Sequence, residues 1–179
     1  MIKEIEGDLI SLALAGKFDV IAQGCNCFCT MGAGIALQIK TTFPEVYQID
    51  LKTERGNVFK LGEFSKYYYK NIKLKVYNLY TQYEPGCNGE YTAVALALRN
   101  MAESLKGDEE IGLPLIGCGI AGLDYRLVKK IIQQELANFD VTIVKFKQPV
   151  IDRRLDYDVH LKDIPKDKTI EHIRQIKLY

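Results

Sequence analysis

The sequence lacks a marked excess of either charge, a long apolar run and a cationic leader. Its 24 lysine and arginine residues against 23 aspartate and glutamate residues give a formal net charge of +1. This near balance predicts no strong binding to nucleic acid and no attraction to an anionic membrane. No run of about 18 apolar residues is present, so we expect no membrane-spanning helix. The start MIKEIEGDLI has no cationic segment leading into an apolar one, so we expect no secretory signal and a cytoplasmic protein, or a nuclear one if the source is eukaryotic.

Cysteine and histidine are too few and too far apart for the usual structural zinc sites. Cys25, Cys27 and Cys29 alternate along the chain, while the two histidines, His160 and His172, lie far from them. Structural zinc sites use paired cysteine or histidine ligands at short spacings, so we expect no metal and no cofactor. Five cysteines in a chain that is not exported are expected to be reduced thiols. Small apolar side chains that fill a crowded turn are the simplest interpretation of the three.

Three familiar nucleotide-binding or hydrolase motifs are missing or misplaced. No lysine follows a glycine turn in the arrangement of a P-loop, and the pattern G-x-S-x-G of a nucleophile elbow occurs nowhere. Gly117, Gly119 and Gly122 do satisfy G-x-G-x-x-G. A dinucleotide-binding unit would also need an acid at the end of the next strand. Asp140 lies before the apolar run Val141–Phe146 and not after it, so the match is interpreted as accidental.

Apolar runs bounded by turn residues alternate with segments of helical spacing, which predicts an α/β fold with a mixed sheet flanked by helices. The expected strands are Met1–Glu6, Phe18–Gln23, Phe64–Tyr69, Lys73–Tyr80, Ile111–Ile116 and Val141–Phe146. The expected helices are Leu9–Ala15, a segment from Gly34, a second from Pro44, Tyr91–Leu105 and Asp124–Phe139.

The length of 179 residues suits one globular domain with a sizeable core. We assign residues 1–147 to this domain. Residues 148–179 are more charged and irregular, and a short helix is expected within them at Thr169–Ile176. We interpret them as a C-terminal extension packed on the same domain.

Two segments share one pattern, in which an apolar strand is followed by a glycine-rich turn and a helix. The first passes through Gly32 and Gly34, and the second through Gly117, Gly119 and Gly122. Glycine lets backbone N–H groups approach a ligand with no Cβ in the way, and a helix start adds unpaired donors that favour phosphate. In open α/β sheets, ligands sit beyond the carboxyl ends of the strands. We therefore expect both turns to face one crevice suited to a diphosphate or a phosphorylated sugar; the alternative is that the glycines only permit tight turns.

Four short motifs occur in a specific order along the chain. They are GDL at Gly7–Leu9, GCNC at Gly24–Cys27, MGAGIA at Met31–Ala36 and IGCGIAG at Ile116–Gly122. Together they resemble the macrodomain family, over roughly residues 1–147. The resemblance implies a three-layer α/β/α fold with a mixed central sheet, and a crevice that binds ADP-ribose or ADP-ribose 1''-phosphate. The branch that it resembles contains ADP-ribose 1''-phosphate phosphatases and terminal ADP-ribose glycohydrolases.

The resemblance also implies roles for single residues. Asp8 would accept a hydrogen bond from the adenine amino group, although an aspartate here also suits a helix N-cap. Asn26 would bond the hydroxyls of the distal ribose, and the second glycine turn would wrap the diphosphate through backbone N–H groups. The implied ligand-binding residues are Asp8, Leu9, Asn26, Gly32, Ala33, Gly34, Ile35, Thr81, Gly117, Cys118, Gly119, Ile120, Ala121 and Gly122.

The residues implied for catalysis depart from both groups of enzymes in that branch. Members that remove ADP-ribose through a lysine carry it just after a threonine, whereas here Gln82 follows Thr81, and glutamine cannot act as a nucleophile. The histidine of the phosphatases corresponds to Gln23. The candidate catalytic residues are therefore Asn26 and, as a base, Asp124, for which capping of a helix N-terminus is the alternative.

Three functions follow as hypotheses. The first is hydrolysis of ADP-ribose 1''-phosphate to ADP-ribose and phosphate, favoured by the missing lysine. The second is an ADP-ribosyl hydrolase that removes ADP-ribose from protein or nucleic acid. The third is a module that binds ADP-ribose without catalysis. The expected partners are ADP-ribose, ADP-ribose 1''-phosphate and ADP-ribosylated macromolecules.

Overall fold

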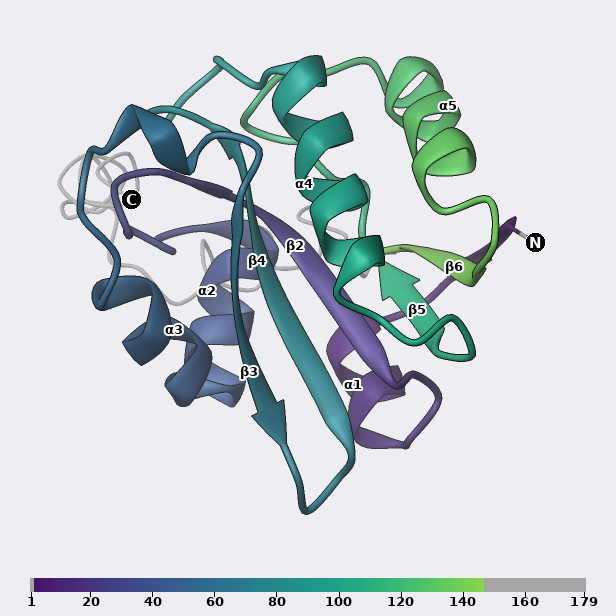
Figure 1. Ribbon diagram of the computed structural model, residues 1–179. Helices are drawn as coiled ribbons and strands as arrows, with labels where there is room; N and C mark the ends of the chain where they lie inside the picture. The colour runs from purple at the N-terminus through teal and green to yellow at the C-terminus, as the bar shows by residue number, and fades with distance from the viewer. Residues whose placement is uncertain (1, 147–179) are drawn as a thin grey trace, which may run out of the picture. The chain divides into compact units, whose positions relative to one another are not determined.

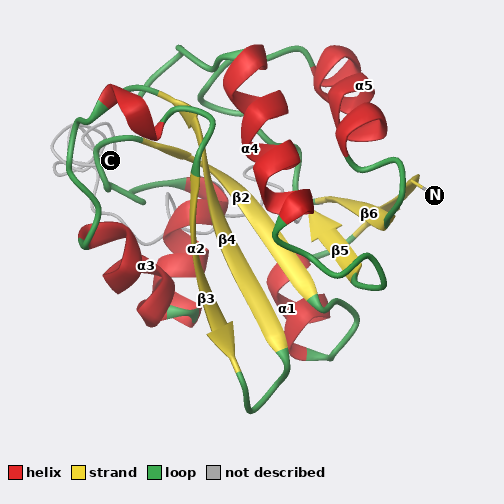
Figure 2. Ribbon diagram, in the orientation of Figure 1, coloured by secondary structure: helices red, strands yellow, loops and turns green. Residues whose placement is uncertain are grey.

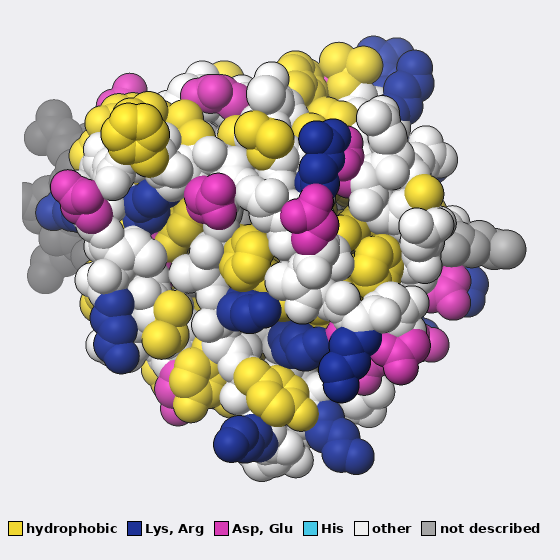
Figure 3. Space-filling model, in the orientation of Figure 1, with side chains coloured by type: hydrophobic (Ala, Val, Ile, Leu, Met, Phe, Trp, Pro, Cys, Tyr) yellow, Lys and Arg dark blue, Asp and Glu magenta, His cyan; other side chains and the backbone are white. Residues whose placement is uncertain are grey.

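The computed structural model describes residues 2–146, whose helices and strands are drawn in Figures 1 and 2. Met1, the extension proposed for residues 148–179 and the short helix expected at Thr169–Ile176 lie outside the described residues. Within residues 2–146, no helix is both long enough and apolar enough to cross a membrane. The face drawn in Figure 3 carries both acidic and basic side chains, in keeping with the net charge of +1.

Residues 2–146 form a six-stranded sheet in the order β1-β6-β5-β2-β4-β3. The strands are β1 (Ile2–Glu6), β2 (Val20–Asn26), β3 (Phe64–Tyr69), β4 (Leu74–Gln82), β5 (Glu110–Leu113) and β6 (Asp140–Lys145). Strands β1, β6, β5, β2 and β4 pair in parallel, and β3 returns antiparallel along β4 as one arm of a hairpin. The mixed sheet predicted from the sequence is thus confirmed.

Helices cover both faces of this sheet (Figure 2). They are α1 (Leu9–Leu14), α2 (Gly34–Thr42), α3 (Pro44–Leu51), α4 (Tyr91–Glu103) and α5 (Tyr125–Glu135), with a 3-10 turn η1 (Val58–Lys60). One apolar core lies between the sheet and α4 and α5, and a second lies between the sheet and α1, α2 and α3. The three-layer α/β/α arrangement is confirmed.

Alternation along the central strand explains why both cores form. In β2, Val20 and Ala22 enter the core under α4 and α5, while Ile21 enters the core under α1 to α3, and all three are fully buried. Side chains of a strand point alternately to opposite faces, so a continuous apolar run is required where helices cover both. Burying a side chain of the size of Val20 or Ile21 contributes about 1.5–3 kcal/mol.

Several strand ends differ from the sequence prediction, and the largest differences are at the carboxyl ends of β5 and β2. Strand β5 ends at Leu113 and not at Ile116, because Pro114 has no N–H to continue the ladder. Strand β2 continues three residues beyond Gln23 to Asn26, because its neighbour β4 extends to Gln82 and pairs with it. A register shift between Cys25 and Asn26 accompanies this extension.

The site is positioned by the central strands β5, β2 and β4. They are adjacent and parallel, so their carboxyl ends lie at one edge of the sheet. Each of the three then leads through a loop into a helix, namely α5, α2 and α4 in that order. Loops at the carboxyl ends of neighbouring parallel strands form the usual ligand crevice of such sheets.

Candidate functional site

A cavity of about 490 Å³ lies at the carboxyl ends of β2, β4 and β5. This volume falls within the range of about 300–1,000 Å³ that is typical of small-molecule sites. Its wall is made mainly by the three loops that follow these strands. The lining residues are Gly24, Cys25, Asn26, Thr30, Met31, Gly32, Ala33, Gly34, Ile35, Ala36, Asp50, Thr81, Gln82, Pro85, Gly86, Pro114, Leu115, Ile116, Gly117, Gly119, Ile120 and Ala121. Both glycine turns singled out in the sequence therefore face one cavity.

Glycine keeps the cavity open at two of these positions. A Cβ added at Gly34 or at Gly119 would meet no heavy atom within 4 Å. Gly34 also has a φ of +55°, in the left-handed region that glycine tolerates best. It is the first residue of α2, whose N-cap, Ala33, has no side chain that could cap the helix. The first amides of α2 are therefore left for another acceptor.

Other glycines bring the strand ends close together. A Cβ at Gly24 would lie 2.8 Å from the Thr81 Oγ1 atom and 3.3 Å from the Cγ2 atom of Ile116. A side chain at this position of β2 would therefore clash with Thr81 on β4 and crowd Ile116 in the loop after β5. Gly117 has a φ of +69°, and its Cβ would meet the Cδ1 atom of Leu123 at 2.6 Å. These two glycines shape the floor of the cavity and do not merely line it.

Asn26 and Thr30 form a fixed polar pair on the cavity wall. The Asn26 Oδ1 atom accepts a hydrogen bond from the backbone N–H of Phe28 at 2.9 Å, and its Nδ2 atom donates to Thr30 Oγ1 at 2.7 Å. These two bonds orient the Asn26 side-chain amide and leave its second N–H available to a ligand. Because the Thr30 hydroxyl accepts from Asn26, its own proton can be donated elsewhere. The pair thus offers two donors, which suit the hydroxyl or phosphate oxygens of a ligand.

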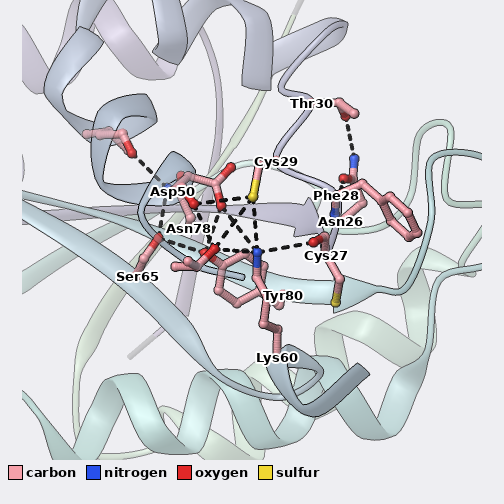
Figure 4. A network of polar contacts seen from close by, with 12 residues as sticks. Asn26, Cys27, Phe28, Cys29, Thr30, Asp50, Lys60, Ser65, Asn78 and Tyr80 are labelled. Atoms are coloured by element: carbon pink, nitrogen blue, oxygen red, sulfur yellow. Dashed lines mark hydrogen bonds and ion pairs between the residues drawn. The ribbon is translucent and has the colours of Figure 1, made fainter. Parts of the chain in front are cut away.

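A buried charged network lies beside the cavity and was missed by the sequence reasoning (Figure 4). Its centre is the ion pair between the Lys60 Nζ and Asp50 Oδ1 atoms, 3.7 Å apart. Asp50 Oδ1 also accepts from the Tyr80 hydroxyl at 2.8 Å. Asp50 is fully buried. Among the described residues that line the cavity, it is the only charged one. Nothing in the sequence spacing of these residues indicates that they meet.

The three alternating cysteines pack as small apolar side chains. Cys25, Cys27 and Cys29 are all buried, and desolvation raises the pKa of the Cys25 and Cys27 thiols. A raised pKa keeps a thiol protonated and unreactive. This geometry agrees with the packing interpretation of these residues. Within the described residues, no group of three or more histidine, cysteine, aspartate or glutamate side chains could hold a metal ion.

The family of the chain follows from comparison with known proteins. The sequence model of the Macro domain matches residues 22–132, which is more than half of the chain. The chain is a macrodomain. An uncharacterized 17.5 kDa protein from the tk-vs intergenic region of Enterobacteria phage T4 is 38% identical over 153 residues, covering 82% of this chain and 97% of its own. The human ADP-ribose glycohydrolase OARD1 is 27% identical over 145 residues, covering 79% of this macrodomain and 88% of its own chain.

Solved structures share the fold of this macrodomain. The structure of Thermosipho africanus DarTG in complex with ADP-ribose aligns with a TM-score of 0.67 at 19% identity. The alignment covers 86% of this chain and 44% of that one. At this identity the likeness concerns the fold alone.

Gln82, the residue after Thr81, holds a loop of the cavity wall. Its Nε2 atom donates to the carbonyl oxygen of Glu84 at 2.8 Å and, over a longer distance of 3.4 Å, to that of Gly86. The loop between β4 and α4 is also tied across the site, since Gly89 N–H donates to the carbonyl of Ala121 at 2.9 Å. Gln82 therefore shapes the wall of the macrodomain cavity.

Five residues expected at the site do not line the cavity of this macrodomain. Asp8 caps α1 by accepting from the Ser11 N–H at 2.6 Å, and Leu9 is buried in the core beside it. The remaining residues of this group are Cys118, Gly122 and Asp124. Cys118 points back to the carbonyl oxygen of Ile116, to which its thiol donates at 3.2 Å.

Asp124 is engaged at the start of α5. It is the N-cap of that helix, and its Oδ1 atom accepts from the Arg126 N–H at 2.7 Å. Its Oδ2 atom also forms an ion pair with the Arg126 guanidinium at 2.8 Å. Hydrogen bonds from Arg126 hold the pKa of Asp124 below its usual range, which weakens it as a base. The geometry supports the alternative interpretation, in which Asp124 caps the N-terminus of α5. The catalytic role of Asp124 stays a prediction.

Proposed function

We propose that this macrodomain binds ADP-ribose in the cavity and hydrolyses a bond at its distal ribose, with ADP-ribose 1''-phosphate as the leading substrate. The observation that carries the proposal is the convergence of two glycine-rich loops, from the neighbouring strands β2 and β5, on one cavity. Two relatives support it: one is named an ADP-ribose glycohydrolase, and one of similar fold was solved with ADP-ribose.

The parts of ADP-ribose match the parts of the cavity. The loop from Gly117 to Ala121, in which the Cys118 amide already donates to the Leu115 carbonyl, and the uncapped start of α2 at Gly34 would provide backbone amides for the diphosphate. The donors of Asn26 and Thr30 suit the oxygens of the distal ribose. Asp8, the residue proposed for the adenine, lies outside the cavity wall, so its contact with adenine would be made at the rim.

Hydrolysis of ADP-ribose 1''-phosphate suits a site with few ionisable groups. Water adds to the phosphorus, the bond between phosphorus and the C1'' oxygen breaks, and ADP-ribose and phosphate are released. The leaving oxygen needs a donor, and the Asn26–Thr30 pair can supply hydrogen bonds to it. Holding the water and the phosphate in line lowers the barrier without a strong base.

Removal of ADP-ribose from protein or nucleic acid is the second candidate. It is favoured by the name of the human relative, an ADP-ribose glycohydrolase. In this chain Gln82 stands after Thr81 and its amide bonds the neighbouring loop, so a lysine-linked intermediate is excluded at this position. Water would therefore have to attack the ribose C1'' directly.

Calorimetric titration tests the binding step. We expect ADP-ribose to bind and AMP, which lacks the second phosphate and the distal ribose, to bind at least about tenfold more weakly. The variant Asn26→Ala should weaken ADP-ribose and leave the weak binding of AMP unchanged. Equal affinities for the two ligands would contradict the assignment of the diphosphate and the distal ribose to this cavity.

Product analysis tests the chemical step. Phosphate released from ADP-ribose 1''-phosphate supports the leading function, and free ADP-ribose released from a modified protein or oligonucleotide supports the second. A protein that binds ADP-ribose tightly and turns over neither substrate is a binding module, which would overturn both hydrolytic functions.

A further inference from the structure

The loop that follows Asn26 and carries Thr30 is strained. We refer to residues 27–33 as the β2–α2 loop. Within it, Cys29 has a φ of +56° and Met31 a φ of +39°, although neither is a glycine. A non-glycine residue in the left-handed region costs about 1 kcal/mol or more. Such a conformation persists only where surrounding contacts determine it.

One side chain from a distant part of the sequence makes several of those contacts. Lys60, the last residue of η1, donates from Nζ to the carbonyl oxygen of Cys27 and to the sulfur of Cys29, both at 3.2 Å. The same Nζ atom donates to Thr53 Oγ1 at 2.5 Å and lies 4.2 Å from the centre of the Tyr80 ring. An ammonium group has three protons, and all of them are directed at the loop and its support.

The opposite charge comes from α3. The Asp50 Oδ1 atom lies 3.7 Å from the Lys60 Nζ atom, and the backbone carbonyl of Asp50 accepts a hydrogen bond from the Cys29 thiol at 3.2 Å. Asp50 therefore touches both the lysine and the loop that the lysine holds. Figure 4 shows the Lys60 amine between Cys27 of the loop and Asp50, with Tyr80 beside the lysine side chain.

The burial of this pair distinguishes it from a surface ion pair. The Asp50 side chain is fully buried and that of Lys60 is 9% exposed. Two desolvated charges are costly to bury, and an apolar pair of equal size is often as stable or more so. A net gain in stability therefore does not explain the pair. Directed bonds to a strained loop do explain it.

We propose that the Lys60–Asp50 pair is a positioning device that holds the β2–α2 loop so that the Asn26–Thr30 donors face the cavity. Lys60 fixes the Cys27 carbonyl, one residue from Asn26, and the Cys29 sulfur, one residue from Thr30. The consequence for ligand binding rests on the proposed function, whereas the effect on the loop does not.

A charge-neutral double variant tests the device. Lys60→Met keeps the length and the apolar stem, and Asp50→Asn keeps an oxygen that accepts from Tyr80. Either single change would leave one buried charge uncompensated and could prevent folding, so the double variant is the informative one. The matched control is Lys75→Met with Glu109→Gln, which removes another partly buried ion pair, 2.6 Å apart, between Lys75 on β4 and Glu109 just before β5.

Amide hydrogen exchange measures the opening of the β2–α2 loop directly. In the Lys60/Asp50 double variant, the amides of Cys27 and Phe28 should exchange at least about tenfold faster, while core amides such as that of Ile21 stay protected. The control double variant should leave the Cys27 and Phe28 amides unchanged. Unchanged loop exchange in the Lys60/Asp50 variant, or equal acceleration in both variants, would overturn the proposal.

Calorimetric titration with ADP-ribose measures the effect of the variant on ligand affinity. We expect the Lys60/Asp50 variant to bind ADP-ribose at least about tenfold more weakly and the control variant to bind like wild type. Faster loop exchange with unchanged affinity would show that the loop is held but does not position ligand donors, which overturns the positioning role. If wild type does not bind ADP-ribose, the proposed function fails, and the exchange experiment still decides whether the pair holds the loop.

Discussion

At the scale of single residues, glycines of the same motif serve two physically different purposes. Gly119 has open space where a side chain would go, so a molecule in the cavity can approach its backbone. Gly117 has a positive φ and would clash with Leu123, so its role is to permit the turn itself. The motif alone does not separate these roles, because both positions are glycine and neither carries a side chain.

Substitution at these two glycines should separate binding from stability. Gly119→Val should abolish ADP-ribose binding and leave the urea unfolding midpoint unchanged, because its side chain fills the cavity without a clash. Gly117→Val should reduce the free energy of unfolding by more than about 1 kcal/mol, because φ and packing both oppose it. Urea unfolding and calorimetry on the same samples provide the check. Loss of stability in Gly119→Val would show that the open space is not available to a ligand.

Asp124 allows a second residue-scale prediction. Asp124→Asn retains an N-cap side chain for α5 but removes the charge that pairs with Arg126. We expect turnover of ADP-ribose 1''-phosphate to stay within about twofold of wild type, because Asp124 does not line the cavity and its exposed ion pair adds little to stability. A loss of about a hundredfold in kcat with unchanged KM would instead establish Asp124 as a general base. Steady-state kinetics distinguish the two outcomes.

At the scale of elements, the edge strand β1 is attached by charge as well as by backbone pairing. Glu4 accepts from the Tyr125 hydroxyl at 2.7 Å and pairs with Lys129 at 2.5 Å and with Lys145. Hydrogen bonds from Lys129, Lys145 and Tyr125 lower the pKa of Glu4 from 4.5 to about 2. One carboxylate thereby links β1, β6 and α5.

This attachment should depend on pH with a defined sign. A folded-state pKa below the unfolded value means that the carboxylate stabilises the fold above pH 4.5 and that this contribution is lost as pH falls to about 2. Glu4→Gln should therefore lower the urea midpoint at pH 6 and have little effect at pH 2. Asp108→Asn, at an exposed position, is the control. An equal effect of Glu4→Gln at both pH values would contradict the charge attachment.

At the scale of the whole molecule, the cavity joins parts of the fold that are far apart in sequence. Its wall draws on loops after β2, β4 and β5 and on α3. A ligand that bridges these parts binds the folded state and not the unfolded chain. Binding should therefore be measurable as a change in global stability.

Thermal unfolding provides that measurement. ADP-ribose at about 100 times its dissociation constant should stabilise the fold by about 2.7 kcal/mol, which raises the unfolding temperature. AMP at the same concentration should raise it less, and Gly119→Val should remove the response. A rise in Tm for Gly119→Val equal to that for wild type would place the ligand elsewhere on the molecule.

The sequence by itself determined the elements, the fold class and the two glycine turns. Apolar spacing is a local property, so the runs Val141–Phe146 and Tyr91–Leu105 indicate a strand and a helix without reference to the rest of the chain. The motifs at Met31–Ala36 and Ile116–Gly122 also require glycine for local reasons of backbone shape, which is why they could be recognised before the fold was known.

Only the tertiary structure decided which side chains share the site. Lys60 and Asp50 meet beside Cys29 because η1 and α3 pack against the same loop, and no spacing in the sequence encodes that contact. Asp124 reads as a base candidate in the sequence, yet in the fold its carboxylate is occupied by α5 and Arg126. Contacts between distant segments depend on strand order and helix packing, so they are decided by the whole chain and not by any one motif.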